Sequence, residues 1–279
     1  MSVIPDTEPL WVEPPPQTPQ QQTAQPQYIQ PQAPVAQNGS HSIFSLKYYA
    51  QYFNVDTADV LQRSVLALNP FTTRQVFLFH TQDNPDPLLP DLYGPFWITS
   101  SVIFALFFAS SVTGVIISKL VQHTNYEYRF DLLTGAASML YSYTFLWPIG
   151  LWAAAHYLGL LTTQPNATIT SFVSLYGYSN IIWIPVAILA VAPLDGLLPK
   201  FTDLFRWFIV LLGCAFSSIF LARNLRALFI PDSTAAVAID RKPGAILLGL
   251  SLLVHGGISV AVKFLFFASH TTKTPAEQI

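Results

Sequence analysis

The sequence predicts an all-α, polytopic integral membrane protein, a bundle of five transmembrane helices that follows a cytosolic, partly disordered N-terminal region. The first observation is composition, because 52% of the 279 residues are apolar and only 10% are charged, unlike the surface of a soluble protein. The second is that five apolar runs reach the roughly 20 residues needed to cross a bilayer core. The third is that these runs do not alternate between apolar and polar residues. Because lipid offers the backbone no hydrogen-bond partners, helices are expected rather than strands.

Residues 1–42 are predicted to form a disordered, Pro/Gln-rich tail. The first 40 residues hold nine prolines and nine glutamines and no lysine or arginine. Such a composition buries too little apolar surface to offset the entropy lost on ordering the chain. The start of the chain also has neither the basic nor the apolar segment of a signal peptide. Insertion into the membrane is therefore expected to depend on the spans themselves.

Residues 43–90 are predicted to form a cytosolic, amphipathic helical region. Its apolar residues recur at helical spacing in two groups, Phe44, Tyr48 and Tyr52, then Leu61, Val65 and Leu68. Asp56 is placed as the N-cap of the second helix, with Asp59 at the capping-box position and Pro70 just beyond its end. Two roles remain open for these helices. They either cover the membrane-facing side of the spans or form a surface on which a partner docks.

Residues 91–268 are predicted to be the five-span membrane domain, and residues 269–279 a short lumenal tail. The apolar runs are Phe96 to Ser118, Leu132 to Leu158, Ile169 to Val191, Leu204 to Ala222 and Gly244 to Ala268. Pro148 and Pro185 are expected to kink the second and third spans, because proline removes a backbone hydrogen bond inside a helix.

The orientation follows from the long polar segment before the first span. Lys and Arg are distributed too evenly among the links to decide the orientation. Moving some 95 mainly polar residues across a membrane without a signal peptide is harder than leaving them in the cytosol. The N-terminus is therefore placed in the cytosol and the C-terminus in the lumen. On this topology the sequons at Asn38 and Asn166 both face the cytosol and carry no sugar.

The chemistry expected of an enzyme is missing from the sequence. The six histidines are scattered, and there is no phosphate-binding loop, nucleophile elbow or metal-ligand spacing, so no catalytic residue, metal or cofactor is predicted. No basic stripe exists to bind nucleic acid. The predicted spans contain no Asp or Glu. Lys263 is expected to extend toward the membrane surface, and His255 is expected to be a neutral packing group hydrogen-bonded to a neighbouring helix.

Two short motifs give the chain a resemblance to a known family. Asp91-Leu92-Tyr93-Gly94-Pro95 leads directly into the first span, and Gly177-Tyr178 lies in the third. Together with the upstream stretch YYAQYFNVDTADVLQRSVLALNP, this resembles the Yip (Ypt-interacting protein) family, most of all the branch of vertebrate Yip-domain members one and two and their fungal counterparts. The resemblance covers roughly residues 45–268. It implies a non-enzymatic Golgi membrane protein that binds Rab/Ypt small GTPases and other Yip-family proteins and acts in vesicle-mediated, ER-to-Golgi transport.

The motif at residues 91–95 is interpreted as a rigid stop before the first helix, because Pro95 disfavours helical geometry at Gly94. It is also expected to dock partners, so that Asp91→Asn and Tyr93→Phe would weaken partner recovery. The tyrosines around Gly177 are expected to supply amphipathic surface near the headgroups on the same side of the membrane.

Two other functions stay open. One is a transporter or lipid-handling protein with a polar cavity around Pro148, Pro185, His255 and residues 141–144. The other is a membrane-remodelling structural protein that acts on membrane lipid through its amphipathic helices.

Overall fold

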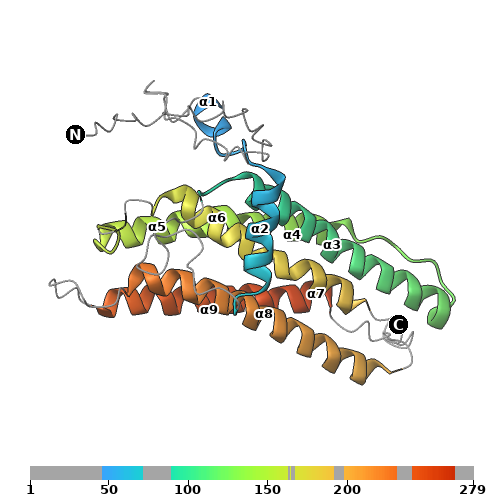
Figure 1. Cartoon of the computed structure of the whole chain (residues 1–279). Coiled ribbons are helices and arrows are strands. Elements are labelled where there is room, and N and C mark those ends of the chain that lie inside the picture. The colour runs from blue at the N-terminus through green and yellow to red at the C-terminus, as the bar shows by residue number, and fades with distance from the viewer. Residues whose placement is uncertain are drawn as a thin grey trace, which may run out of the picture. The chain divides into compact units, whose positions relative to one another are not determined.

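The computed structural model describes residues 46–71, 89–162, 164, 167–191, 198–230 and 241–267. Every regular element in these ranges is a helix, which confirms the all-α class (Figure 1). The elements are α1 (Leu46–Ala50), α2 (Thr57–Leu68), α3 (Tyr93–Ile117), η1 (Ser118–Gln122), α4 (Phe130–Tyr141), η2 (Ser142–Leu146), α5 (Trp147–Tyr157), α6 (Ile169–Ser179), η3 (Asn180–Ile182), α7 (Trp183–Ala190), α8 (Pro199–Phe229) and α9 (Arg241–Phe266). The predicted Pro/Gln tail, the asparagines of both sequons and the predicted lumenal tail lie outside the described residues.

Four of the five predicted spans are present as helices long and apolar enough to cross a membrane. They run over Tyr93–Ile117, Ile169–Ala190, Lys200–Phe229 and Lys242–Phe266. The remaining predicted span, the second, is helical from α4 through η2 to α5 but is interrupted by the five-residue π-helix η2. A multi-pass helical membrane protein is therefore established, and the crossing of the second segment stays a prediction.

Both predicted kinks coincide with a change of helix type just before a proline. The π-helix η2 ends at Leu146, two residues before Pro148, and the 3-10 helix η3 ends at Ile182, three residues before Pro185. Proline has no N–H to donate and its ring crowds the preceding turn, so the backbone bonds of that turn must be rearranged. The two prolines therefore explain why these segments are not single regular α-helices.

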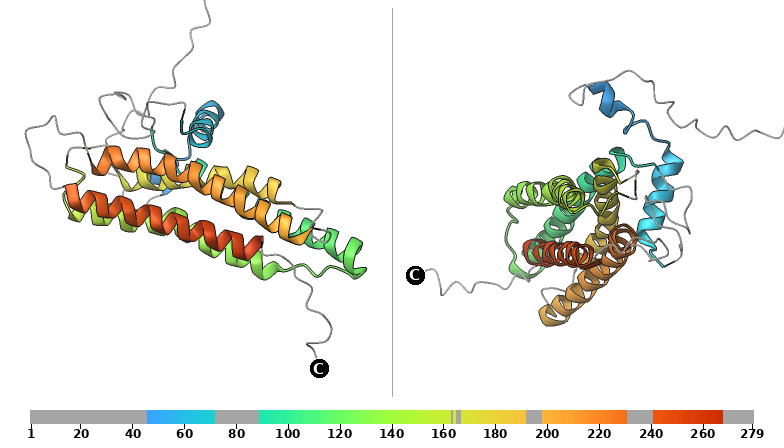
Figure 2. Two further views of the ribbon diagram at one scale, coloured as in Figure 1. Left: turned by 90° about the horizontal axis from the view of Figure 1, so that it is seen from below. Right: turned by 90° about the vertical axis from the view of Figure 1, so that its left-hand side faces the viewer.

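The helices α3 to α9 run side by side, whereas α2 runs across them (Figures 1 and 2). The first span, α3, packs against α4, α6 and α7, and the last two helices, α8 and α9, form an antiparallel pair. Helix α2 contacts α6, η3 and α8. A segment that precedes the first span is thus packed onto the third and fourth.

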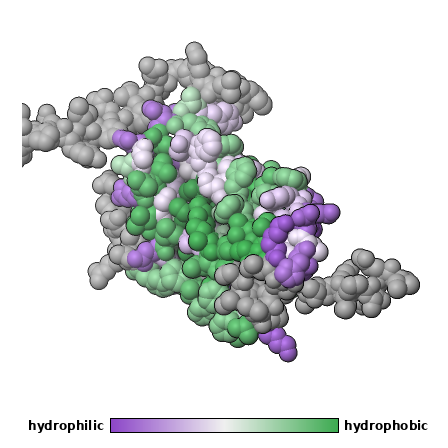
Figure 3. All heavy atoms as spheres, turned by 90° about the vertical axis from the view of Figure 1, so that its right-hand side faces the viewer, coloured by the Kyte–Doolittle hydropathy of each residue, from purple (hydrophilic) through white to green (hydrophobic). Residues whose placement is uncertain are grey.

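The outer surface of the bundle is apolar over much of its length. Figure 3 looks onto one end of the bundle and shows apolar residues over much of the described surface there, with hydrophilic residues in small groups. Large apolar side chains more than half exposed include Phe104 and Phe108 on α3, Leu211 on α8 and Leu253 on α9. Exposure of this kind is stable when lipid, rather than water, surrounds the helices.

Candidate functional site

The first turn of α3 contains part of the Asp91-to-Pro95 motif, so the prediction of a stop before the helix is wrong. The helix begins at Tyr93 with Leu92 as its N-cap, and Gly94 and Pro95 are its second and third residues. Pro95 is accepted there because the first turn of a helix has no use for its missing N–H. Gly94 has no Cβ to crowd the proline ring, which relieves much of the restriction on a residue before proline.

Asp91 supplies the cap that Leu92 does not. The backbone N–H of Gly94 donates to Oδ1 of Asp91 at 2.6 Å, while Leu92 makes no side-chain cap bond. A carboxylate at this position satisfies an orphan donor and favours the positive end of the helix dipole. The acidic residue of the motif is therefore part of the start of α3.

The other carboxylate oxygen of Asp91 joins three segments of the chain. Its Oδ2 accepts from an Nη atom of Arg63 on α2 at 2.5 Å and from the hydroxyl of Tyr178 on α6 at 3.1 Å. Asp91 is 0% exposed and Arg63 is 4% exposed. A charge buried this deeply is tolerated only when it is paired and hydrogen-bonded. We call the residues Arg63, Asp91, Gly94, Gly177 and Tyr178, together with Pro95, the junction.

The two glycines of the junction allow α3 and α6 to approach closely. A Cβ on Gly94 would overlap the ring of Tyr178, and a Cβ on Gly177 would overlap the backbone and ring of Pro95. Each motif thus provides the space that the other fills. This interlocking explains why glycine stands at both positions, since any side chain there would push the helices apart.

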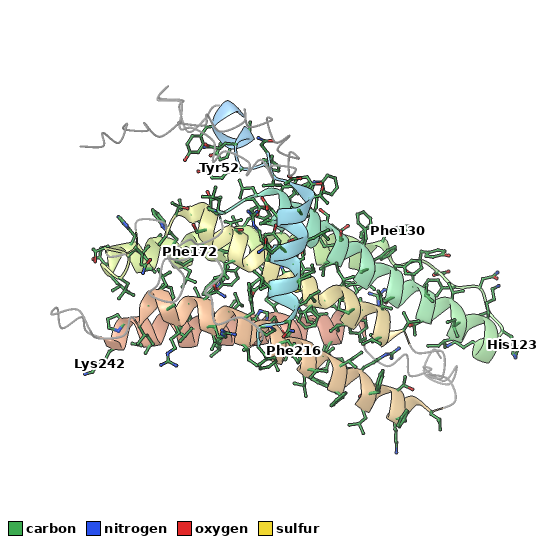
Figure 4. The ribbon with its side chains drawn as sticks, in the orientation of Figure 1. Tyr52, His123, Phe130, Phe172, Phe216 and Lys242 are labelled. Carbon is green, nitrogen blue, oxygen red and sulfur yellow. The ribbon has the colours of Figure 1, made fainter. Side chains whose placement is uncertain are left out.

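Further contacts fix the segments on either side of α2. The backbone N–H of Leu92 donates to the carbonyl of Tyr52 at 3.0 Å. Beyond the end of α2, an Nη atom of Arg223 donates to the carbonyl of Pro70, and the rings of Phe71 and Phe216 meet edge to face at 5.3 Å. Figure 4 labels Tyr52 and Phe216 near the two ends of α2. Helix α2 is therefore held at its middle by Arg63 and also beyond each end.

The structure brings the predicted site residues together but distributes them between the interior and the surface. Asp91, Gly94, Pro95, Gly177 and Tyr178 are all buried. Leu92 is half-buried, and Tyr93 remains 39% exposed. The expectation that the tyrosines flanking Gly177 provide amphipathic surface is wrong, because Tyr176 and Tyr178 are both 0% exposed.

Arg63 is the junction residue that the sequence reasoning did not select. It lies on the buried face of α2 with Val60, Ser64 and Ala67. An arginine spaced three or four residues from apolar positions on an amphipathic helix is a signal that it faces the interior. That signal is weak, but it points to a buried carboxylate partner.

A second group of polar side chains lies inside the bundle, around His255 of α9. The hydroxyl of Tyr143 is 2.5 Å from Nδ1 of His255, and the hydroxyl of Ser217 is 2.6 Å from its Nε2. The imidazole is 0% exposed. It thus connects η2, α8 and α9, which agrees with the predicted packing group bonded to a neighbouring helix.

We expect His255→Leu to cost about 1 to 3 kcal/mol of stability, because it leaves the buried hydroxyl of Tyr143 without this partner. The function of the chain in cells should nevertheless persist, since the imidazole is a packing group. Thermal unfolding in mild detergent measures the first effect, and Tyr143→Phe is the matched variant that removes the other half of the bond. Lost activity at normal abundance and location would contradict this role and favour a transport function.

Lys263 does not extend to the membrane surface as predicted. Its Nζ donates to Oδ1 of Asp203 on α8 at 2.7 Å and to the carbonyl of Phe267 at 3.0 Å, and it lies 5.1 Å from the centroid of the Trp207 ring. The side chain is 3% exposed. The prediction failed because α8 begins at Pro199, several residues before the expected start, and so brings Asp203 into the helix pair.

A cavity of about 440 Å³ lies where the α5–α6 link meets the segment around α1. Tyr48 and Tyr52 line one side, and Trp152, His156 and the N-terminal residues of α6 line the other. The indole of Trp152 stacks on the imidazole of His156 at 5.2 Å. Within the part of the chain that the structure describes, no group of three or more His, Cys, Asp or Glu residues is placed to hold a metal ion.

The apolar helices and the buried junction between them define the class of this chain, a multi-pass α-helical membrane protein whose N-terminal helix α2 is locked onto its spans. The Yip1 domain matches residues 79–263, and the chain belongs to that family. The matched range contains both motifs of the junction but not Arg63.

Similar proteins occur in yeasts and in an amoeba. The chain is 37% identical over 173 residues to "Protein YIP5" of Schizosaccharomyces pombe, covering 62% of this chain and 64% of that protein. It is 28% identical over 231 residues to "Protein YIPF1 homolog" of Dictyostelium discoideum, covering 83% and 58%. With "Protein YIP5" of Saccharomyces cerevisiae it shares 30% identity over 184 residues, covering 63% and 57%. The chain thus spans between 57% and 64% of the length of these relatives. No solved structure is significantly similar to it.

Proposed function

We propose that this chain is a non-enzymatic Golgi membrane protein that binds Rab/Ypt small GTPases and other Yip-family proteins and acts in vesicle-mediated transport between the ER and the Golgi. The observation that carries the proposal is membership of the Yip1-domain family over residues 79–263. The names of the relatives place them in the same group. In this proposal the N-terminus is cytosolic and the C-terminus lumenal.

The junction supports an adaptor role because it gives the region before the spans a fixed position. Asp91, paired with Arg63 and Tyr178, has its carboxylate in the interior, so in our proposal it acts as scaffold. The docking role falls to the exposed aromatic residues of the first turn, Tyr93, Phe96 and Trp97, which are 39%, 39% and 53% exposed. The ring of Trp97 contacts the rings of Tyr93 and Phe96, with centroids 6.2 and 5.2 Å apart. Aromatic side chains on a rigid support are the residues that most often dominate binding at protein interfaces.

Tyr93→Ala should therefore reduce the co-purification of Rab/Ypt GTPases and Yip-family proteins about tenfold, since a loss of 1.4 kcal/mol corresponds to that factor. The measurement is recovery from gently solubilised Golgi membranes, normalised to the Golgi pool of each variant. Phe104→Ala is the control, because Phe104 is also exposed, at 62%, but lies well along α3. Equal recovery for Tyr93→Ala and the wild type would remove the first turn of α3 from the binding surface.

The proposed topology is tested separately. Protease added outside sealed microsomes should remove the region before the first span, and both sequons should remain unglycosylated. Their asparagines, Asn38 and Asn166, lie outside the described residues. Any N-linked sugar at either residue would invert the topology and remove the proposed docking surface from the cytosol. A sequon introduced near residue 275 serves as the positive control, because the proposed topology places it in the lumen.

A second candidate function, transport or lipid handling, is favoured by one observation. The bundle contains two sets of buried hydrogen bonds. One links Tyr143, His255 and Ser217. In the other, the hydroxyl of Tyr176 accepts from the indole N–H of Trp147 and donates to Ser251. Polar and ionisable side chains buried inside a bundle of spans mark transport pathways in many membrane proteins. The His255→Leu experiment described above separates the two functions.

A further inference from the structure

Helix α2 lies level with the start of the first span, and the third and fourth spans extend beyond this level. On α6 the contact is at Tyr178, which shares the carboxylate of Asp91 with Arg63 of α2 and lies nine residues from the first residue of α6, or about 13 Å along its axis. On α8 the chain just beyond α2 makes its contact through Phe71 at Phe216, thirteen residues before the last residue of α8, or about 20 Å. In a five-span arrangement these two helix ends are on the same side of the membrane. The first span fixes this level, because Asp91, the partner of Arg63, lies two residues before α3, and Gly94 in the first turn of α3 lies against Tyr178. When α3 crosses the bilayer, α2 is therefore at the boundary of the bilayer core on the N-terminal side.

The direction of α2 fits such a position. Figure 1 shows α2 running across the spans rather than alongside them, so it is roughly parallel to the membrane plane when the spans cross it. Helices that lie in the plane at the boundary of headgroups and acyl chains have a separate apolar face and polar face.

The residues of α2 divide into three faces at helical spacing. The face toward the spans is buried and includes Val60, Arg63, Ser64 and Ala67. A second face is apolar but not covered by the protein. Its members are Ala58, Leu61, Val65 and Leu68; Leu61 and Val65 are 61% and 62% exposed, whereas Leu68 is half-buried. The remaining side carries the polar residues Asp59 and Gln62 together with Leu66, which is half-buried and packs against the core.

The charges on the inner side of α2 are compensated, as a site within a leaflet requires. Arg63 is paired with Asp91, and the chain just after α2 receives a hydrogen bond from Arg223 through the carbonyl of Pro70. Phe71, which follows directly, is 62% exposed beside its ring contact with Phe216. Ionised side chains near lipid are stable when they are paired in this way.

We propose that α2 is an in-plane membrane helix, seated in the leaflet on the N-terminal side, with Leu61 and Val65 in contact with lipid acyl chains and Gln62 toward the headgroups. Because this apolar face lies at the boundary of the bilayer core, beside spans that also expose large apolar side chains, the proposed occupant is lipid rather than a second protein. The proposal depends on the spans crossing the bilayer and not on any partner, so it stands or fails independently of GTPase binding.

The test uses the full-length chain in proteoliposomes with a single cysteine that carries a bimane probe. The native Cys214 is first replaced by alanine, and cysteine is then placed at Leu61, Val65 or Gln62. Two reference positions calibrate the readings: Phe108, which is 67% exposed in the middle of α3, and Tyr157, which is 90% exposed at the end of α5. Quenching is measured with lipids brominated on their acyl chains and, separately, with aqueous iodide.

Probes at Leu61 and Val65 should be quenched by brominated lipid to within about twofold of the probe at Phe108 and should respond weakly to iodide. The probe at Gln62 should respond to iodide several-fold more strongly than those at Leu61 and Val65. If iodide quenches Leu61 and Val65 as strongly as Tyr157, α2 lies in water and the proposal is overturned. If neither quencher reaches Leu61 and Val65, a second copy or another protein covers this face, and the lipid contact is equally excluded.

Discussion

Asp91→Asn is expected to lower the free energy of unfolding by about 3 to 5 kcal/mol, because it leaves the buried guanidinium of Arg63 without its counter-charge. For a chain of this size such a loss corresponds to a fall of roughly 10 °C in the thermal midpoint. Arg63→Gln is expected to have an effect of similar size, since it leaves the buried carboxylate of Asp91 without its counter-charge. The double variant should be less destabilised than the sum of the two single variants, because neither unpaired charge remains. Thermal unfolding of the purified chain in mild detergent measures all three.

The exposed pair between Arg129 and Asp131 provides a matched control. Its N–O distance is 2.8 Å, but its side chains are 56% and 65% exposed. Asp131→Asn should therefore leave the midpoint nearly unchanged, because water and salt screen such a pair. If Asp91→Asn also left the thermal midpoint nearly unchanged, the buried ion pair would not be what holds α2 to the spans.

Gly177→Ala is the second substitution with a large expected effect. The added methyl would overlap the backbone of Pro95, which cannot move without shifting the start of α3. Overpacking of this kind costs about 1 to 3 kcal/mol, and alanine's better helix propensity, worth about 1 kcal/mol, offsets only part of it. We therefore expect a lower thermal midpoint and a smaller yield of folded protein in fluorescence-detected gel filtration.

The control is Gly249→Ala on α9, where an added Cβ meets nothing within 4 Å. Here only the helix propensity changes, so the midpoint should stay the same or rise slightly. Opposite responses from two chemically identical substitutions would show that the contact with Pro95, and not the loss of glycine, causes the damage. A neutral Gly177→Ala would mean that α3 and α6 can separate at little cost.

The sequence was sufficient to locate four of the five predicted spans, because bilayer thickness sets the length of an apolar run regardless of how the helices pack. It also located Asp56 as the N-cap of α2, whose carboxylate accepts from the N–H of Thr57, since capping depends on adjacent residues. The errors arose where a boundary depends on detail within one turn. The start of α3 at Tyr93 was missed because the rule that disfavours a helix before proline assumes a side chain, which Gly94 lacks.

The contacts of the junction could not be predicted from one sequence. Asp91 and Tyr178 are 87 residues apart, and Arg63 and Asp91 are 28 apart. Their meeting depends on the packing angles of whole helices, which residue spacing does not encode. For His255 the sequence indicated that a partner exists, because a buried imidazole needs one, but it did not identify Tyr143 or Ser217.

The bond between Tyr178 and Asp91 also constrains the order in which the protein can be made. When Asp91 leaves the ribosome, Tyr178, which donates a hydrogen bond to its carboxylate, has not yet been synthesised. The chain must grow by 87 further residues before Tyr178 also leaves the ribosome. At synthesis rates of about 5 to 20 residues per second, this interval lasts roughly 4 to 17 seconds. During that time the first span can enter the bilayer, but it cannot reach its final contacts. A half-made or truncated chain therefore exposes an incomplete charged site, a feature by which the membrane's quality-control machinery could distinguish it from the finished protein.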